Sequence, residues 1–332
     1  MRLTQLFTVA ISVCVGCSSI VHEPLPPSPL QPVSEIRYVM GTLLDITLFA
    51  ATQQEGRAIL NDTFTIAEHL DDVLSTWKPE SPVSFFNRDR TPVLRPVDPD
   101  LYAVAIRSQD LSQKTDQAFT IGVRPLVTMW EGATKTGIAP SPSAIARAKE
   151  LIAPKNLLTS PPANLGKRLP EIMIETGGIG KGYAVDKMVS YLTSRGVRHA
   201  LINFGRSSIA AIGTPPNARG WRMELALTEG STEGTVELRD ETLSVSRARG
   251  TPFIVNGVAY AHIFDPQNGM PVKASRGAAI RGPSATDGEA FVKYLIIRGA
   301  PPISVTNGWG NVDWIVRNGD YRASSDRFFR RG

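Results

Sequence analysis

The sequence predicts an α+β fold: a single domain in which mixed, largely antiparallel sheets pack against helices. The first half of the chain carries apolar residues at helical spacing, whereas the part after residue 220 alternates apolar and polar residues between turns rich in glycine, asparagine and proline. Helices and strands do not alternate strictly, as a doubly wound parallel sheet would require. Neither an internal repeat nor a second linker divides the body, so one domain is expected.

The N-terminus, residues 1–16, is expected to be a lipoprotein-type signal peptide. Arg2 precedes an apolar run over residues 6–15 that is too short to span a bilayer as a permanent helix. Val15-Gly16-Cys17 resembles the end of a bacterial lipobox, although Cys14 stands where leucine is usual. We therefore expect export and a lipid on Cys17 that anchors the protein to a bacterial membrane, on the periplasmic side in a Gram-negative cell. A plainly cleaved secretory signal is the alternative.

Residues 17–35 read as a proline-rich tether, because five prolines between Val21 and Val33 cannot pack as a core. The domain is then expected to occupy residues 36–332. Both cysteines of the chain precede it, so the body has no disulfide, no thiolate nucleophile and no cysteine-based zinc site.

The first half of the body shows an extended segment followed by two helices. Residues 38–49 read as extended, and residues 54–77 carry apolar side chains at helical spacing. Asp98-Pro99-Asp100 predicts the start of the second helix, with an N-cap, a proline in the first helical position and an acid in the first turn.

The second half begins with a predicted strand over residues 171–175, a glycine-rich turn and a helix whose apolar face includes Val185 and Met188. Alternating segments from Trp221 onward predict strands, interrupted by one helix over about residues 285–298.

The composition, with 42% hydrophobic and 20% charged residues, is that of an ordinary globular protein. The formal net charge of +5 is mildly basic, but lysine and arginine are scattered along the chain. This distribution favours a solvated surface, and no nucleic acid is expected as a partner.

The segment E-T-G-G-I-G-K-G-Y-A-V-D, residues 175–186, places four glycines around Lys181. It is neither a Walker loop, because Gly182 follows the lysine, nor a dinucleotide fingerprint, because Tyr183 stands at the last glycine position. Backbone N–H groups at a helix N-terminus and a nearby lysine nevertheless suit an anion. A tight turn with Lys181 merely solvated explains the same residues.

Four further stretches surround this segment in a fixed order: M-G-T (40–42), L-S-T-W-K-P-E-S-P-V-S-F-F-N (74–87), A-F-T-I-G-V-R-P-L-V-T-M-W (118–130) and Y-A-H-I-F-D-P-Q-N-G-M-P-V (260–272). Together with the glycine segment they resemble the FAD:protein FMN transferase (ApbE) family over residues 36–299, as a divergent member. The resemblance implies a T-fold-related domain. It also implies an enzyme that takes FAD as its substrate, transfers FMN to a threonine hydroxyl of an exported or membrane-bound acceptor protein, and releases AMP with the help of Mg²⁺.

The resemblance also assigns residues to the flavin site, where Trp77 supplies an aromatic ring for stacking. Thr120 replaces the acid that is usual at its position, and Glu175 stands where Asp is frequent. The residues expected around FAD are Met40, Ser75, Thr76, Trp77, Ala118, Phe119, Thr120, Glu175, Lys181, His262 and Ile263.

His262 and Lys293 are the residues expected to act on the pyrophosphate. His262 lies in the H-x-x-D-P pattern and can contact the pyrophosphate as a cation or accept a proton when neutral. Asp186 ends the glycine segment and is expected to cap or brace its helix.

The metal positions implied by the resemblance are Gly178, through its backbone oxygen, Glu289 in place of Asp, and Lys293 in place of Thr. A rival alignment uses Asp287 and Phe291 instead. A charged lysine cannot ligate a metal. Lys293 therefore either takes the space of the metal or marks a catalytically impaired, FAD-binding lipoprotein. A pyrophosphatase that splits FAD into FMN and AMP is a further alternative.

Overall fold

The computed structural model describes residues 29–228, 232–248, 253–273, 276–302, 309, 313–318, 321–325 and 328–329. The expected signal peptide and Cys17 lie outside these residues, as does the first part of the expected tether. Within the described chain, no helix is both long enough and apolar enough to cross a bilayer.

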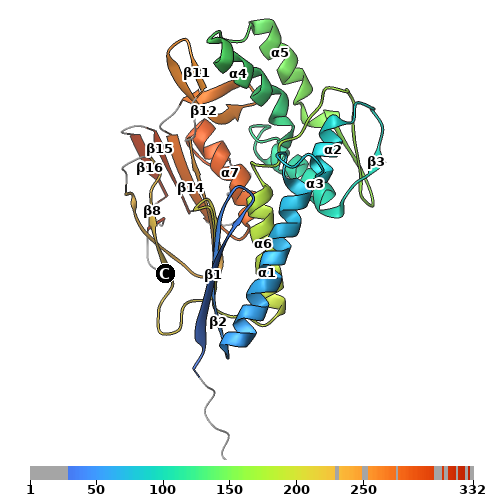
Figure 1. Cartoon of the computed structure of the whole chain (residues 1–332). Coiled ribbons are helices and arrows are strands. Elements are labelled where there is room, and N and C mark those ends of the chain that lie inside the picture. Colours follow the sequence, from blue (N-terminus) through green and yellow to red (C-terminus); the bar gives the residue numbers. More distant parts are fainter. Residues whose placement is uncertain are drawn as a thin grey trace, which may run out of the picture.

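The central element is an antiparallel sheet with the strand order β1-β2-β6-β7-β10-β14-β15-β16 (Figure 1). Hairpins join β1 to β2, β6 to β7 and β15 to β16, and longer connections bring the remaining neighbours together. The strands are β1 Gln31–Val39, β2 Thr42–Ala50, β6 Ala200–Phe204, β7 Ser208–Ile212, β10 Glu241–Arg247, β14 Arg276–Gly282, β15 Asp313–Asn318 and β16 Tyr321–Ser324.

Three helices, α1 (Gln53–Leu74), α6 (Gly180–Ser194) and α7 (Ala285–Arg298), cover one face of this sheet (Figure 1). Helix α1 packs on β1 and β2, α6 on β6 and β7, and α7 on β10 and β14, while α6 contacts both of the other helices. Their apolar faces and the facing strand residues form the main hydrophobic core, in which Phe64, Met188 and Phe291 are buried.

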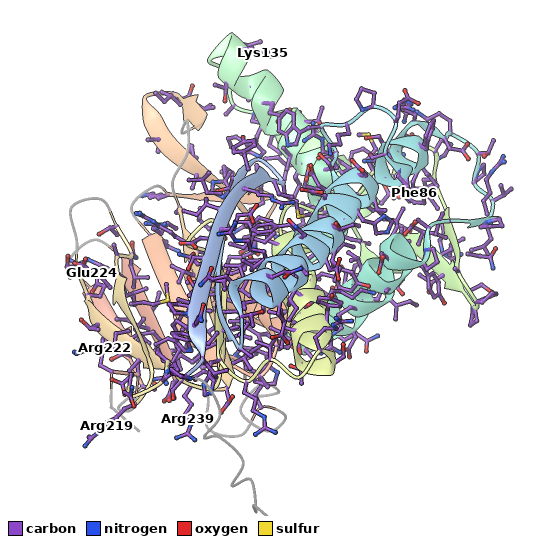
Figure 2. All side chains as sticks on the ribbon, turned by 60° about the horizontal axis from the view of Figure 1, so that its bottom comes forward. Phe86, Lys135, Arg219, Arg222, Glu224 and Arg239 are labelled. Carbon is purple, nitrogen blue, oxygen red and sulfur yellow. The ribbon has the colours of Figure 1, made fainter. Side chains whose placement is uncertain are left out.

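The opposite face of the sheet is covered by the hairpin of β8 (Trp221–Leu225) and β9 (Gly234–Leu238). Trp221 and Leu225 are buried, whereas Arg222 and Glu224 between them are exposed and point away from the body (Figure 2). This alternation of apolar and polar residues buries one face of the hairpin and leaves the other in water.

Smaller units extend from one end of the layers. Helix α4 packs against α5 and β11, and these elements share a second core around Trp130. The elements of these units are α2 Pro82–Arg88, α3 Pro99–Lys114, α4 Arg124–Thr136, α5 Pro142–Leu151, the short 3₁₀ helices Ile121–Val123 and Pro154–Asn156, the sheet of β3 Arg95–Pro96, β5 Asn164–Lys167 and β4 Leu157–Ser160, and the sheet of β11 Phe253–Val255, β12 Val258–Asp265 and β13 Met270–Lys273.

The predicted α+β fold is confirmed, and two helix starts agree with their local signals. Asp98 caps α3 by accepting hydrogen bonds from the backbone N–H groups of Asp100 and Leu101 at 2.8 and 3.4 Å. Helix α7 spans residues 285–298, as its pattern predicts, and the side chain of Ser284 caps it.

Three expectations from local patterns differ from the structure. Strand β1 begins at Gln31, inside the segment expected to be a tether, because Val33 is buried beside Gly56 of α1. Residues 38–49 are two strands, since the backbone turns at Met40 and Gly41. Residues 171–175 form no strand; instead, Ile174 exchanges hydrogen bonds of 2.8 and 2.9 Å with the Asn87 side chain.

Candidate functional site

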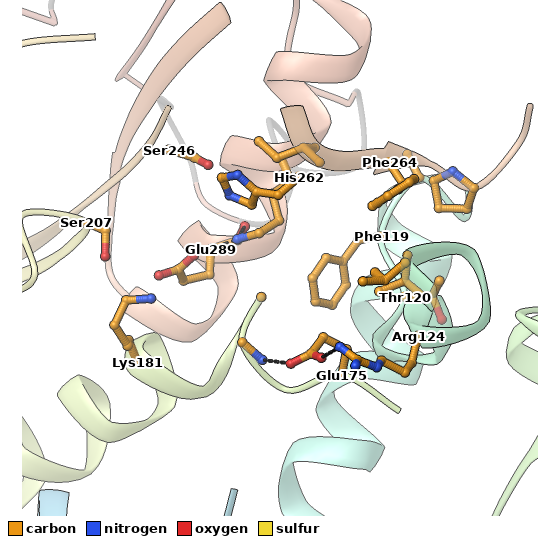
Figure 3. Close-up of a pocket in the computed structure, with 18 of the residues that line it drawn as sticks. Phe119, Thr120, Arg124, Glu175, Lys181, Ser207, Ser246, His262, Phe264 and Glu289 are labelled. Atoms are coloured by element: carbon orange, nitrogen blue, oxygen red, sulfur yellow. Dashed lines mark hydrogen bonds and ion pairs between the residues drawn. The ribbon is translucent and has the colours of Figure 1, made fainter. Parts of the chain in front are cut away.

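A cavity of about 540 Å³ lies where the start of α6, the middle of α7 and the end of β10 meet α4 and β12 (Figure 3). Trp77 stands at this cavity with 86% of its surface exposed. A large aromatic ring left in water at a cavity is available to stack on a planar ligand. The charged groups that line the cavity are Arg124, Glu131, Glu175, Lys181, Arg247, Glu289 and Lys293, with His262 as a further titratable group.

Most residues predicted for the flavin site line this single cavity. They come from five stretches of sequence that are far apart in the chain, and the fold brings them together. The lining includes Trp77, Ala118, Phe119, Thr120, Glu175, Gly178, Lys181, His262, Ile263, Glu289 and Lys293. Their individual roles remain predictions.

Met40, Ser75 and Thr76 do not line the cavity, although Thr76 is bonded to Glu175, which does. Met40 packs against the start of α6, since a Cβ built on Gly180 would lie 3.3 Å from its Cε. Ser75 follows the last residue of α1, and its carbonyl oxygen accepts a hydrogen bond of 2.7 Å from Ser81. Thr76 Oγ1 donates to Glu175 Oε1 at 3.2 Å.

Glu175 is held by three groups, which fixes its carboxylate at the cavity wall. Besides Thr76, the backbone N–H of Gly177 donates to Oε1 at 3.2 Å, and Arg124 Nη1 pairs with Oε2 at 3.1 Å. The Gly177 N–H group is therefore already used within the turn. Sequence reasoning did not single out Arg124, although it lies in the 118–130 stretch directly before Pro125, where a helix start is expected.

Glu289 and Lys293 form an ion pair at the inner wall of the cavity. Lys293 Nζ lies 2.6 Å from Glu289 Oε2 and 3.0 Å from the Glu289 carbonyl oxygen, one helical turn away on α7. Ser208 donates to the other carboxylate oxygen, Oε1. Only 4% of the Glu289 side chain and 18% of the Lys293 side chain are exposed.

The surroundings of Glu289 favour its ionised form. Burial raises the pKa of this carboxyl, but the charges of Lys293 and Lys181 and the hydrogen bonds from Lys293 and Ser208 outweigh burial and hold the pKa below its usual value. Lys181 and Glu289 point toward the same part of the cavity (Figure 3). Ser208 was missed as a partner of Glu289; it belongs to the G-R-S-S stretch at the β6–β7 turn.

Asp287, the acid of the rival alignment, does not line the cavity. Asp287 is buried and makes a bidentate ion pair with Arg107 of α3, with Arg107 Nε at 2.7 Å from Oδ1. Asp287 and Glu289 lie two positions apart on α7, so they project in different directions. The Arg107 pair consequently ties α7 to α3, and of these two acids Glu289 is the one that lines the cavity.

The glycine segment serves the contact between α6 and α7. A Cβ on Gly182 would lie 2.4 Å from the carbonyl oxygen of Ala285 and 2.9 Å from Cγ of Glu289, so only glycine lets the two helices approach this closely. Asp186 was expected to cap or brace its own helix. It instead accepts four hydrogen bonds from Ser284, Ala285 and Thr286 and thereby holds the first turn of α7.

His262 lies on β12 at the cavity, where its ring faces the end of β10 that carries Ser246 (Figure 3). The turn that follows it is held to α7 by a bidentate ion pair between Asp265 and Arg298, with distances of 2.8 and 3.2 Å. The cavity residues Ser207, Ser246 and Arg247 were not predicted from the sequence.

The fold and the cavity define a ligand-binding α+β protein in which an exposed tryptophan, several cations and a buried ion pair surround one site. The model of the ApbE family matches residues 40–304, about four fifths of the chain. The chain belongs to the ApbE family.

Proteins named FAD:protein FMN transferase are among its relatives. The one from Klebsiella pneumoniae (strain 342) is 23% identical over 309 residues, covering 90% of this chain and 88% of the relative. The one from Vibrio cholerae serotype O1 is 26% identical over 247 residues, covering 70% and 71%.

Solved structures of the family share the fold. The ApbE protein of Thermotoga maritima superimposes with a TM-score of 0.78 at 21% identity, covering 90% of this chain and all of that one. The flavin transferase ApbE of Vibrio cholerae gives a TM-score of 0.74 at 20% identity, with 90% and 99% covered.

Proposed function

We propose that this protein is a FAD:protein FMN transferase, as its relatives are named. The observation that carries the proposal is one cavity that is lined by residues from four of the five family stretches and from α7. Trp77 provides a stacking surface for a flavin, and Lys181, Arg247 and His262 provide cations for a pyrophosphate. The overall match of the chain to its relatives over 90% of its length supports the same activity.

In this reaction the hydroxyl oxygen of an acceptor threonine attacks the phosphorus on the FMN side of FAD. The bond from this phosphorus to the bridging oxygen breaks, AMP leaves with that oxygen, and a phosphoester joins FMN to the acceptor. The hydroxyl proton passes to a base. Positioned cations stabilise the charge that develops on the phosphoryl oxygens, so the side chains that line the cavity supply most of the catalysis.

We assign His262 to the pyrophosphate rather than to the proton. Its ring is exposed at the cavity, where an anion can reach it. His262→Ala should then raise the dissociation constant of FAD. A loss of transfer rate with an unchanged dissociation constant would instead identify His262 as the general base.

The residues at the expected Mg²⁺ site do not fit a divalent cation. Mg²⁺ takes oxygen ligands, and here the ammonium of Lys293 lies 2.6 Å from Glu289, the carboxylate among the expected metal ligands. The second oxygen of that carboxylate is hydrogen-bonded to Ser208. No step of the proposed reaction is therefore assigned to a metal.

The test uses the full-length protein in detergent, FAD, and synthetic peptides that carry a threonine as acceptors. We expect flavin fluorescence that stays on the peptide after denaturation, together with release of AMP. FMN and AMP without peptide-bound flavin would identify a pyrophosphatase. Saturable FAD binding without AMP would identify an FAD-binding protein, an alternative that the Lys293–Glu289 pair favours because one charge replaces two at the pyrophosphate.

Trp77→Ala tests the flavin end of the site. We expect FAD binding to weaken about fivefold, because stacking contributes on the order of 1 kcal/mol. Phe85→Ala is the matched control, since Phe85 is also an exposed aromatic residue but does not line the cavity. Equal affinities of the two variants would contradict the stacking role.

We further propose that the protein is exported and anchored through a lipid on Cys17, next to a membrane-bound or exported acceptor. The support is the apolar run over residues 6–15 followed by Val15-Gly16-Cys17. Metabolic labelling with a fatty acid should mark the native protein but not Cys17→Ser. Equal labelling of both would refute the anchor.

A further inference from the structure

The ion pair between Glu289 and Lys293 has an unusual position, because it lies inside the proposed ligand cavity. Glu289 is almost completely buried, and a buried carboxylate is costly unless a cation compensates its charge. Lys293 supplies that charge from within the chain at 2.6 Å. A Cβ built on Gly178 would lie 3.4 Å from Cε of Lys293, so the lysine also fills the space against the turn before α6.

We propose that the Lys293 ammonium replaces a divalent cation in this site, so that the protein binds its pyrophosphate ligand without Mg²⁺. The inference rests on the proposed function for the identity of that ligand. It departs from the metal site that the family resemblance implies, because both carboxylate oxygens of Glu289 are already engaged, Oε2 with Lys293 and Oε1 with Ser208.

The electrostatics of the cavity support this substitution. Lys293 balances Glu289, and Lys181, Arg247 and His262 also line the cavity. A cation that entered the site would have to displace the ammonium and would lie close to both Lys293 and Lys181. Repulsion between like charges in a partly buried site makes this entry unfavourable.

Two variants at one position separate the charge of Lys293 from its ability to exclude a metal. Lys293→Thr removes the charge and introduces a hydroxyl oxygen that can ligate a cation beside Glu289. Lys293→Met removes the charge and introduces no oxygen. Lys187→Thr is the matched control. Lys187 lies on α6, pairs with Asp100 of α3 at 3.1 Å and does not line the cavity.

The first measurement is the affinity for FAD, determined by titration with flavin fluorescence as the readout, once in EDTA and once in excess Mg²⁺. For the native protein and Lys187→Thr we expect dissociation constants that agree within about twofold in the two conditions. For Lys293→Thr we expect binding about tenfold weaker in EDTA and recovery in Mg²⁺. Lys293→Met should be as weak as Lys293→Thr in EDTA and should show no recovery.

The second measurement needs no FAD. Electron paramagnetic resonance measures the binding of Mn²⁺ alone, and thermal unfolding is followed in parallel. The native protein should bind no Mn²⁺ at this site and keep its Tm. Lys293→Thr should unfold at a lower temperature in EDTA, since Glu289 loses its partner, and should regain stability with Mn²⁺.

Mn²⁺ binding by the native protein, or FAD binding that Mg²⁺ tightens by about tenfold or more, would overturn the inference. If the native protein bound FAD in neither condition, the proposed function would fall. The Mn²⁺ and Tm measurements would still decide whether Lys293 excludes a metal. Should Lys293→Thr fail to fold in any condition, the native protein alone decides through its responses to Mg²⁺ and Mn²⁺.

Discussion

Asp186→Ala removes the acceptor that joins α6 to the first turn of α7. Its carboxylate accepts from Ser284 Oγ at 2.8 Å, from the backbone N–H groups of Ala285 at 2.8 Å and Thr286 at 2.9 Å, and from Thr286 Oγ1 at 2.6 Å. The two hydroxyl groups can turn to other acceptors after the substitution. The two N–H groups cannot turn, because they belong to the helix.

The expected loss of stability follows from these four bonds. Leaving a backbone N–H group without its acceptor costs about 1–3 kcal/mol. Because water can reach this half-buried position, we expect a cost at the lower end of that range for each of the two N–H groups. The favourable interaction of a carboxylate with a helix N-terminus adds about 0.3–1 kcal/mol. We therefore expect Asp186→Ala to lower the free energy of unfolding by about 2–4 kcal/mol. Asp186→Asn keeps one acceptor oxygen and should cost about half as much.

Urea unfolding measures this loss. If the slope of the free energy of unfolding against urea concentration is unchanged, the surface area exposed on unfolding is also unchanged. Asp72→Ala is the control, because Asp72 is 73% exposed and pairs with Lys78 on the surface. It should change the free energy of unfolding by less than about 0.5 kcal/mol. If Asp186→Ala cost no more than this control, α7 would not depend on the bridge. FAD affinity should fall with Asp186→Ala as well, because α7 carries Glu289 and Lys293.

Two further substitutions test the scaffold around the site. Lys167 is buried, and burial lowers the pKa of its ammonium group from 10.5 to about 8. Between about pH 8 and pH 10.5 this lysine is therefore protonated in the unfolded chain and neutral in the folded chain. The free energy of unfolding should therefore rise by about 2–3 kcal/mol from pH 7 to pH 10 relative to Lys167→Met; parallel pH curves would contradict this. Arg206 has a φ of 54° in the β6–β7 turn, a left-handed conformation that costs a non-glycine residue about 1–2 kcal/mol. The greater freedom of glycine in the unfolded chain offsets part of this relief, so Arg206→Gly should raise the free energy of unfolding in urea by about 0.5–1 kcal/mol. A lower free energy of unfolding would show that the arginine side chain stabilises the turn.

The sequence by itself determined the elements whose signals are local. The Asp98-Pro99-Asp100 start of α3 and the range of α7 depend on residues within one or two turns of the same helix. The alternation in β8 likewise follows from a chain segment with one face in water. Because five stretches that resemble one family stand in order, the sequence also predicted several residues that line one cavity, but it included Met40, Ser75 and Thr76, which do not line it.

Only the tertiary structure decided which of those residues line the cavity and which do not. Residues 171–175 have the composition of a strand, yet the side chain of Asn87 takes the hydrogen bonds that a neighbouring strand would have made. The choice of Glu289 over Asp287, the pairing of Arg124 with Glu175 and the bridge from Asp186 to α7 also join residues far apart in the sequence. A periodic pattern records which face of an element is buried but not which element lies against that face. The partner of each charged group is therefore set by the path of the chain through the fold.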